Sequence, residues 1–130
     1  MNPPELRYTS EHEWVRVDEG SDTARVGITD YAQEALGDIV YVHVPGMGEA
    51  VETGSAMGEL ESTKSVSDLI APVTGVVTAR NDDLGDSPDL VNADPYGRGW
   101  IFEVRIDPAV LTHQIDRLMD VPAYRTLTGA

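Results

Sequence analysis

The chain has 130 residues, no cysteine, and a formal net charge of -14 from 23 acidic and 9 basic residues. This length suits one domain with a hydrophobic core, and the lack of cysteine excludes disulfides, thiolate metal sites and cysteine nucleophiles. Because the charge disfavours nucleic acid and anionic lipid, and no apolar run is long enough to cross a bilayer, we expect a cytoplasmic protein with neither partner.

The first third of the chain predicts short strands and one helix. Residues 8–17 and 23–28 favour two strands of a hairpin, joined by a turn over residues 18–22. Residues 29–37 begin with capping side chains, continue with helix formers and end in glycine, which predicts a helix of about two turns. The branched and aromatic residues of 38–45 predict a further strand.

Two passages punctuated by glycine, residues 49–61 and 71–80, flank Lys64 on both sides. They look like the halves of a small antiparallel sandwich, related by an approximate two-fold and joined by a hairpin. Residues 62–65 are all polar, which is typical of an exposed hairpin tip. Lys64 is the only lysine, because the other cationic residues are arginines, and arginine is a poor nucleophile. It is therefore the only side-chain amine available for acylation.

The last part of the chain predicts a connector, a strand and a helix. We interpret residues 81–89 as a solvated acidic connector, because the spacing does not match a calcium loop. Turns are expected over residues 90–99 and a strand over residues 100–106. A helix capped by Asp107, with Pro108 at its first position, is expected to include Leu111, Ile115, Leu118 and Met119.

No linker divides the sequence, so we expect one domain over residues 1–130. Its core is expected at about residues 6–106, followed by a C-terminal helical segment at residues 107–127.

The sequence lacks the usual motifs of an enzyme. It contains no dinucleotide fingerprint, no nucleophile elbow and no phosphate-binding loop. His12, His43 and His113 are dispersed, which disfavours a metal site. Glu61 and Asp68 lie three residues before and four residues after Lys64, where a hairpin places both near the tip. They either act with Lys64 or simply solvate a strand edge.

Four ordered blocks resemble the H protein of the glycine cleavage system, over roughly residues 6–125. The central block reads Glu-Ser-Thr-Lys-Ser-Val-Ser-Asp over residues 61–68. The blocks are residues 61–68 with 71–75, residues 8–15, residues 27–33 with 36–42, and residues 90–92 with 94–97 and 99–100. The resemblance implies a mainly β fold, a lipoyl/biotinyl-type barrel-sandwich of antiparallel strands with a short internal helix and a C-terminal helix.

The resemblance also implies that Lys64 carries lipoate and that the protein is a carrier without a catalytic site. Its arm would take an aminomethyl group from glycine decarboxylase to the tetrahydrofolate-dependent aminomethyltransferase, and dihydrolipoamide dehydrogenase would reoxidise it. A lipoate ligase or a lipoyl/octanoyl transferase would attach the arm. A monomer is the simplest form of a carrier that visits several enzymes.

By the same resemblance, Glu13 and Asp68 lie near a surface cleft that shelters the loaded arm, where carboxylates pair with its amine. Glu11 stands where the related proteins often have a small hydroxyl residue, so the resemblance does not settle whether Glu11 contacts the arm.

Two alternatives stay open. Lipoyl domains of 2-oxo acid dehydrogenases are shorter and usually have Asp-Lys-Ala at the tip, whereas Thr63 and Ser65 flank Lys64 here. The second alternative comes from another class: an H-like lipoate relay or binding protein whose lysine is never modified and that acts only by binding, as a lipoate donor or regulator. Biotin carriers normally have methionine on both sides of the lysine, and a catalytic enzyme lacks support in any motif.

Overall fold

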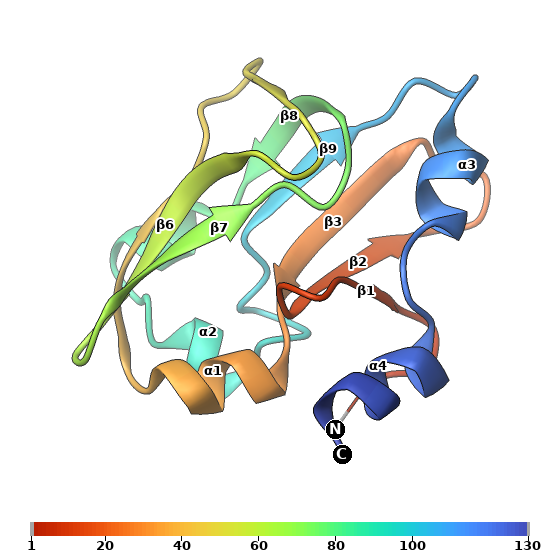
Figure 1. Ribbon diagram of the computed structural model, residues 1–130. Coiled ribbons are helices and arrows are strands. Elements are labelled where there is room, and N and C mark those ends of the chain that lie inside the picture. The colour runs from red at the N-terminus through yellow and green to blue at the C-terminus, as the bar shows by residue number, and fades with distance from the viewer. Residues whose placement is uncertain (1, 130) are drawn as a thin grey trace.

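The computed structural model describes residues 2–129, which form nine strands and several short helices (Figure 1). The strands are β1 (Arg7–Tyr8), β2 (Glu13–Val17), β3 (Thr23–Ile28), β4 (Ile39–His43), β5 (Ala50–Val51), β6 (Ala56–Ser62), β7 (Val66–Ile70), β8 (Gly75–Arg80) and β9 (Phe102–Arg105). The helices are α1 (Asp30–Leu36), the 3-10 helix η1 (Asp82–Gly85), α2 (Leu90–Ala93), α3 (Leu111–Asp116) and α4 (Val121–Thr128).

The strands form two antiparallel sheets. One has the order β1-β2-β3-β9-β8-β5, and the other has the order β4-β6-β7. Buried residues of both sheets share one hydrophobic cluster, for example Val26 and Phe102 from the first sheet and Leu60 and Leu69 from the second. The antiparallel fold predicted from the sequence is confirmed.

A second buried cluster holds the C-terminal helix against β1. Leu6, Tyr8, Trp14, Val121 and Tyr124 pack together, and the rings of Tyr8 and Tyr124 stack with centroids 4.6 Å apart. Burial of such large aromatic side chains stabilises the contact mainly by removing apolar surface from water. Helix α4 is thereby fixed beside β1, as Figure 1 shows.

Helix α1 follows the prediction for residues 29–37 closely. The hydroxyl of Thr29 accepts a hydrogen bond from Ala32 N, which caps the helix at its N-terminus. Gly37 ends it with a φ of +82°, a conformation that favours glycine. The predicted strand over residues 23–28 is also confirmed as β3.

The predicted strand over residues 8–17 is interrupted. β1 and β2 are separate, because residues 9–12 make a tight loop in which His12 has a φ of +64°. Glu13 O accepts a hydrogen bond from Thr9 N, and Thr9 O accepts one from His12 N.

The prediction of a single helix from Asp107 through Met119 was wrong. Asp107 accepts hydrogen bonds from Ala109 N and Val110 N in a turn, so α3 begins only at Leu111. Met119 cannot be helical because its N–H and carbonyl both pair with Tyr8, each at 2.8 Å. A second helix, α4, then begins where Asp120 caps Ala123 N.

The connector after β8 is more ordered than predicted. It contains η1, which Asn81 caps through Asp83 N, and the turns expected over residues 90–99 include α2. No helix within residues 2–129 is long and apolar enough to span a membrane.

Candidate functional site

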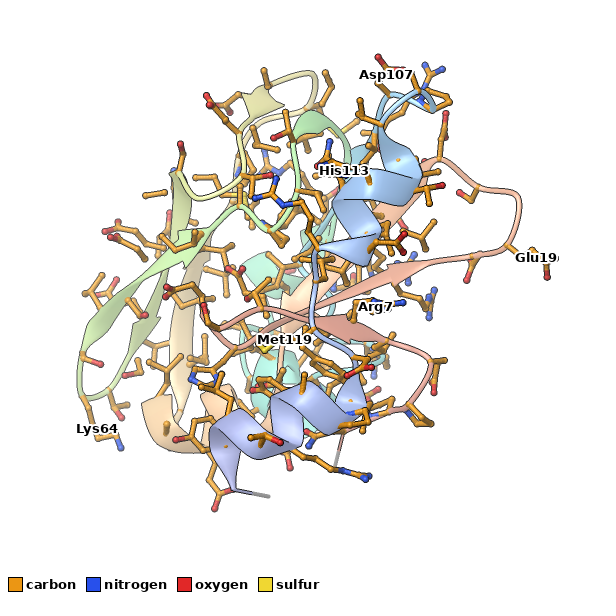
Figure 2. All side chains as sticks on the ribbon, turned by 45° about the vertical axis from the view of Figure 1, so that its right-hand side comes forward. Arg7, Glu19, Lys64, Asp107, His113 and Met119 are labelled. Carbon is orange, nitrogen blue, oxygen red and sulfur yellow. The ribbon has the colours of Figure 1, made fainter. Side chains whose placement is uncertain are left out.

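Lys64 is exposed at the tip of the β6–β7 hairpin (Figure 2). The tip has a defined turn, because the buried hydroxyl of Ser62 accepts hydrogen bonds from Lys64 N and Ser65 N, both at 3.1 Å. Ser62 N also donates to Ser65 O at 2.8 Å. The backbone of Lys64 is therefore held in one place while its side chain extends from the surface.

The C-terminus of α1 supports this tip from one side. Thr63 N donates to Asp38 O at 3.1 Å, and Lys64 Nζ donates to Ala35 O at 3.3 Å. A helix C-terminus attracts a cation, so the unmodified ammonium group suits this position. Gly37 leaves space for the lysine, because a Cβ on Gly37 would lie 2.9 Å from Lys64 Cε.

Asn92 fixes the position of this helix end. Its amide nitrogen donates to Gly37 O at 2.9 Å and to Gln33 Oε1 at 3.0 Å, and its amide oxygen accepts from Ile39 N at 2.9 Å. One side chain thus connects α2, α1 and the start of β4. Asn92 lies in a block that carries the family resemblance, but no local sequence pattern predicts this role for it.

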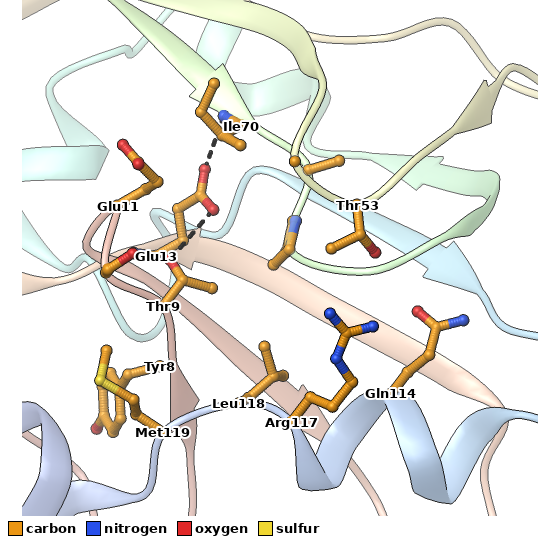
Figure 3. A pocket seen from close by; sticks show the side chains of 14 residues that line it. Tyr8, Thr9, Glu11, Glu13, Thr53, Ile70, Gln114, Arg117, Leu118 and Met119 are labelled. Atoms are coloured by element: carbon orange, nitrogen blue, oxygen red, sulfur yellow. Dashed lines mark hydrogen bonds between the residues drawn. The ribbon is translucent and has the colours of Figure 1, made fainter.

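A surface cleft of about 450 Å³ opens between the loop after β1, the end of β7 and helix α3 (Figure 3). Its lining combines apolar side chains with charged groups on opposite walls. Glu11 and Glu13 lie on one side, and Gln114 and Arg117 lie on the other. The lining residues are Tyr8, Thr9, Ser10, Glu11, Glu13, Thr53, Gly54, Ile70, Ala71, Pro72, Gln114, Arg117, Leu118 and Met119.

Glu13 is a buried acid at the wall of this cleft, with 2% of its surface exposed. Its carboxyl accepts hydrogen bonds from Ile70 N at 2.9 Å and from the Thr9 hydroxyl at 3.4 Å. Burial nevertheless dominates and, with a smaller contribution from the nearby charge of Glu11, raises the pKa of Glu13 to about 8. A carboxyl group with this pKa is mostly protonated at neutral pH.

The loop that carries Glu11 is anchored by His12. His12 Nδ1 lies 2.8 Å from the Tyr124 hydroxyl, and the His12 ring packs 4.6 Å from the Tyr31 ring between centroids. Burial lowers the pKa of His12 below its ordinary value. His12 therefore has a local structural role in holding the loop.

The four site residues predicted from the sequence do not lie together in the structure. Lys64 lies at the tip, and Glu13 lies at the cleft. Glu61 and Asp68 are exposed on β6 and β7, and neither lines the cleft. Within residues 2–129, no group of three or more His, Asp or Glu side chains could hold a metal ion.

Sequence reasoning missed the α3 side of the cleft. Gln114 and Arg117 line the cleft because the chain after α3 pairs with β1 at Met119. No short sequence motif indicates this pairing. Glu11, in contrast, could be found from its spacing, because it lies two residues before Glu13, in the loop that leads into β2.

The chain is similar to known proteins over nearly its full length. A family model described as Glycine cleavage H-protein matches residues 6–129. The glycine cleavage system H protein of Mycobacterium avium (strain 104) is 59% identical over 128 residues, which cover 97% of this chain and 96% of that protein. The one from Mycolicibacterium smegmatis is 56% identical over 125 residues, which cover 96% and 95%.

A solved structure gives the same result. The crystal structure of a glycine cleavage system H protein from Mycobacterium marinum matches with a TM-score of 0.87 and 40% sequence identity. The match covers 98% of this chain and 99% of that chain.

Proposed function

This chain belongs to the glycine cleavage H-protein family, and we propose that it holds a lipoyl group on Lys64 and carries the aminomethyl group of glycine between enzymes. The donor would be glycine decarboxylase, and the acceptor would be the tetrahydrofolate-dependent aminomethyltransferase. The protein itself would catalyse no reaction.

The observation that carries this proposal is the setting of Lys64. It is the only lysine of the chain, and it lies exposed on a turn whose backbone is held by Ser62. An enzyme that acylates this protein meets one side-chain amine in a defined place. Tethering a reactive group there raises its effective concentration at each partner.

The cleft has the chemistry to shelter such an arm. When bound, the lipoyl group supplies a long apolar tether and a disulfide that accepts the aminomethyl unit. Ile70, Ala71 and Pro72 give the cleft an apolar wall for a tether of this kind. Glu13 and Glu11 give it carboxyl groups for an amine.

Protonation of Glu13 gives this storage a physical basis. A neutral Glu13 avoids the cost of a buried charge while no cation is present, because burial raises its pKa to about 8. An amine in the cleft would favour the ionised carboxylate, so Glu13 would release its proton and pair with it. The positive charge of Arg117, on the α3 side of the cleft, would repel the amine of the loaded arm. The arm would therefore bind with its amine pointing away from Arg117.

Asp68 and Glu61 stay candidates for contact with the modified lysine, from positions outside the cleft lining. We also propose that dihydrolipoamide dehydrogenase reoxidises the arm, and that a lipoate ligase or a lipoyl/octanoyl transferase attaches it. The cytoplasmic location, the monomeric state and the single domain predicted from the sequence remain predictions.

The test is exchange of carbon dioxide with the carboxyl group of glycine, catalysed by glycine decarboxylase. Lipoylated wild-type protein is expected to support the exchange, and Lys64→Arg is expected to abolish it while the protein stays folded. A lipoyl domain of a 2-oxo acid dehydrogenase would be lipoylated and still fail in this assay, whereas an H-like protein that acts only by binding would stay unmodified.

A further inference from the structure

The sheet β4-β6-β7 turns one face to solvent next to Lys64. The strand register aligns two rows of side chains on that face. Tyr41, Glu61 and Val66 form the row nearest the tip, and His43, Glu59 and Asp68 form the next row of this kind. All six side chains are exposed. We call these six residues the outer sheet face.

The row nearest Lys64 is unusually apolar for an exposed surface. Tyr41 is 53% exposed and Val66 is 58% exposed, and the adjacent Val40 is 51% exposed. The pairing of β4 with β6 shifts register between Ile39 and Tyr41, and such bulges re-aim side chains. Two consecutive large side chains of β4 therefore both face solvent, where a regular strand would bury one of them.

The outer sheet face also carries concentrated negative charge. Glu59 lies directly opposite Asp68, and like charges in that position destabilise a sheet. Within residues 2–129, Glu59, Glu61 and Asp68 make no ion pair. Large apolar side chains interleaved with carboxylates complement a partner surface that combines apolar and basic side chains.

We propose that the outer sheet face is the docking surface for the enzyme that attaches the lipoyl group to Lys64. This inference rests on the proposed carrier function. The partner surface would place apolar side chains over Tyr41 and Val66 and basic side chains beside Glu61, Glu59 and Asp68.

The distance from Lys64 at which each enzyme acts favours the attaching enzyme over the other partners. Glycine decarboxylase and the aminomethyltransferase act at the far end of a long arm, so their active sites need not approach the hairpin. The attaching enzyme must bring its active site to Nζ of Lys64 itself. Val66 lies only two residues from Lys64, so an enzyme that reaches Nζ comes next to the row that holds Tyr41 and Val66.

The test measures lipoylation of the unmodified protein by the lipoate–protein ligase of its host, with lipoate and ATP. The variants are Tyr41→Ser and Glu59→Arg, because arginine reverses the charge without adding a second acceptor amine. The matched controls are Leu127→Ser on α4, 49% exposed in the wild type, and Glu19→Arg in the turn between β2 and β3, which Figure 2 places far from Lys64.

Each face variant is expected to lower kcat/KM for lipoylation about tenfold, equal to about 1.4 kcal/mol, with little change in kcat. Glu59→Arg is also expected to weaken the dependence of kcat/KM on salt. The control variants are expected to react like the wild type. Circular dichroism and thermal unfolding check that all four variants fold.

The outcomes separate this inference from the proposed function. If the wild type is lipoylated neither by the ligase nor in its own host, the carrier function is wrong. If the wild type and both face variants are lipoylated at equal rates, the carrier function stands and the docking inference is wrong. The inference is also wrong if the face variants impair only exchange with glycine decarboxylase, because the face would then serve that enzyme.

Discussion

Glu13 combines a buried position with hydrogen bonds that favour its charged form. The N–H of Ile70 and the hydroxyl of Thr9 both donate to its carboxyl group. Removal from water outweighs them, so the pKa rises from 4.5 to about 8. An acid in this state is ready to ionise when a cation enters the cleft.

This state predicts a dependence of stability on pH. Between about 4.5 and 8 the folded protein holds a proton on Glu13 that the unfolded chain has lost. The free energy of unfolding should therefore fall as the pH rises through this window, by on the order of a few kcal/mol. Urea denaturation at several pH values between about 4.5 and 8 measures this change in the free energy of unfolding.

Glu13→Gln should flatten that profile, because glutamine does not titrate. Glu59→Gln is the matched control, since Glu59 is exposed, and it should leave the profile unchanged. Equally steep profiles for Glu13→Gln and the wild type would show that Glu13 is not the titrating group.

At the scale of elements, the lysine hairpin depends on its neighbours. β6 and β7 present the tip, α1 ends against it, and Asn92 of α2 connects that helix end to β4. Lys64 is thus positioned by segments that lie well before and well after it in the chain.

Asn92→Ala tests this arrangement. The change leaves Ile39 N without its acceptor and Gly37 O without its donor, which should cost about 1–3 kcal/mol in unfolding free energy. Hydrogen exchange at Thr63 N should also accelerate, because its acceptor is Asp38 O in the same segment.

Asp89→Ala is the control for this change. Asp89 precedes the same helix, but its side chain makes no capping hydrogen bond. A loss of stability in Asp89→Ala equal to that in Asn92→Ala would contradict the specific role of Asn92.

Local patterns predicted the elements that depend on nearby residues. The helix over residues 29–37 carries its own cap and glycine, and the polar residues 62–65 are typical of a tip. Met119 was misplaced because its bridge to Tyr8 joins residues that are distant in sequence. Lys64 could be singled out by counting lysines. Glu13 came from the family resemblance, and the α3 wall of the cleft became visible only in the folded chain.

For the whole molecule, the dominant property is its charge of -14. Such a charge accelerates encounters with basic surfaces, and salt screens it over about 30 Å at 0.01 M but about 8 Å at 0.15 M. The carrier is therefore expected to find its partners by long-range attraction as well as by contact.

The kinetics with glycine decarboxylase provide a test of that attraction. Raising the salt concentration over this range should lower kcat/KM for the lipoylated protein and change kcat little, because the effect acts on association. A kcat/KM that does not vary with salt would contradict electrostatic steering.

The most direct test of the central claim is the intact mass of the protein purified from its own host, supplied with lipoate. We predict one lipoyl adduct per chain, located at Lys64 by peptide mapping and absent from Lys64→Arg. An unmodified mass under these conditions, or an adduct that persists in Lys64→Arg, would contradict the assignment of this chain as a lipoyl carrier through Lys64.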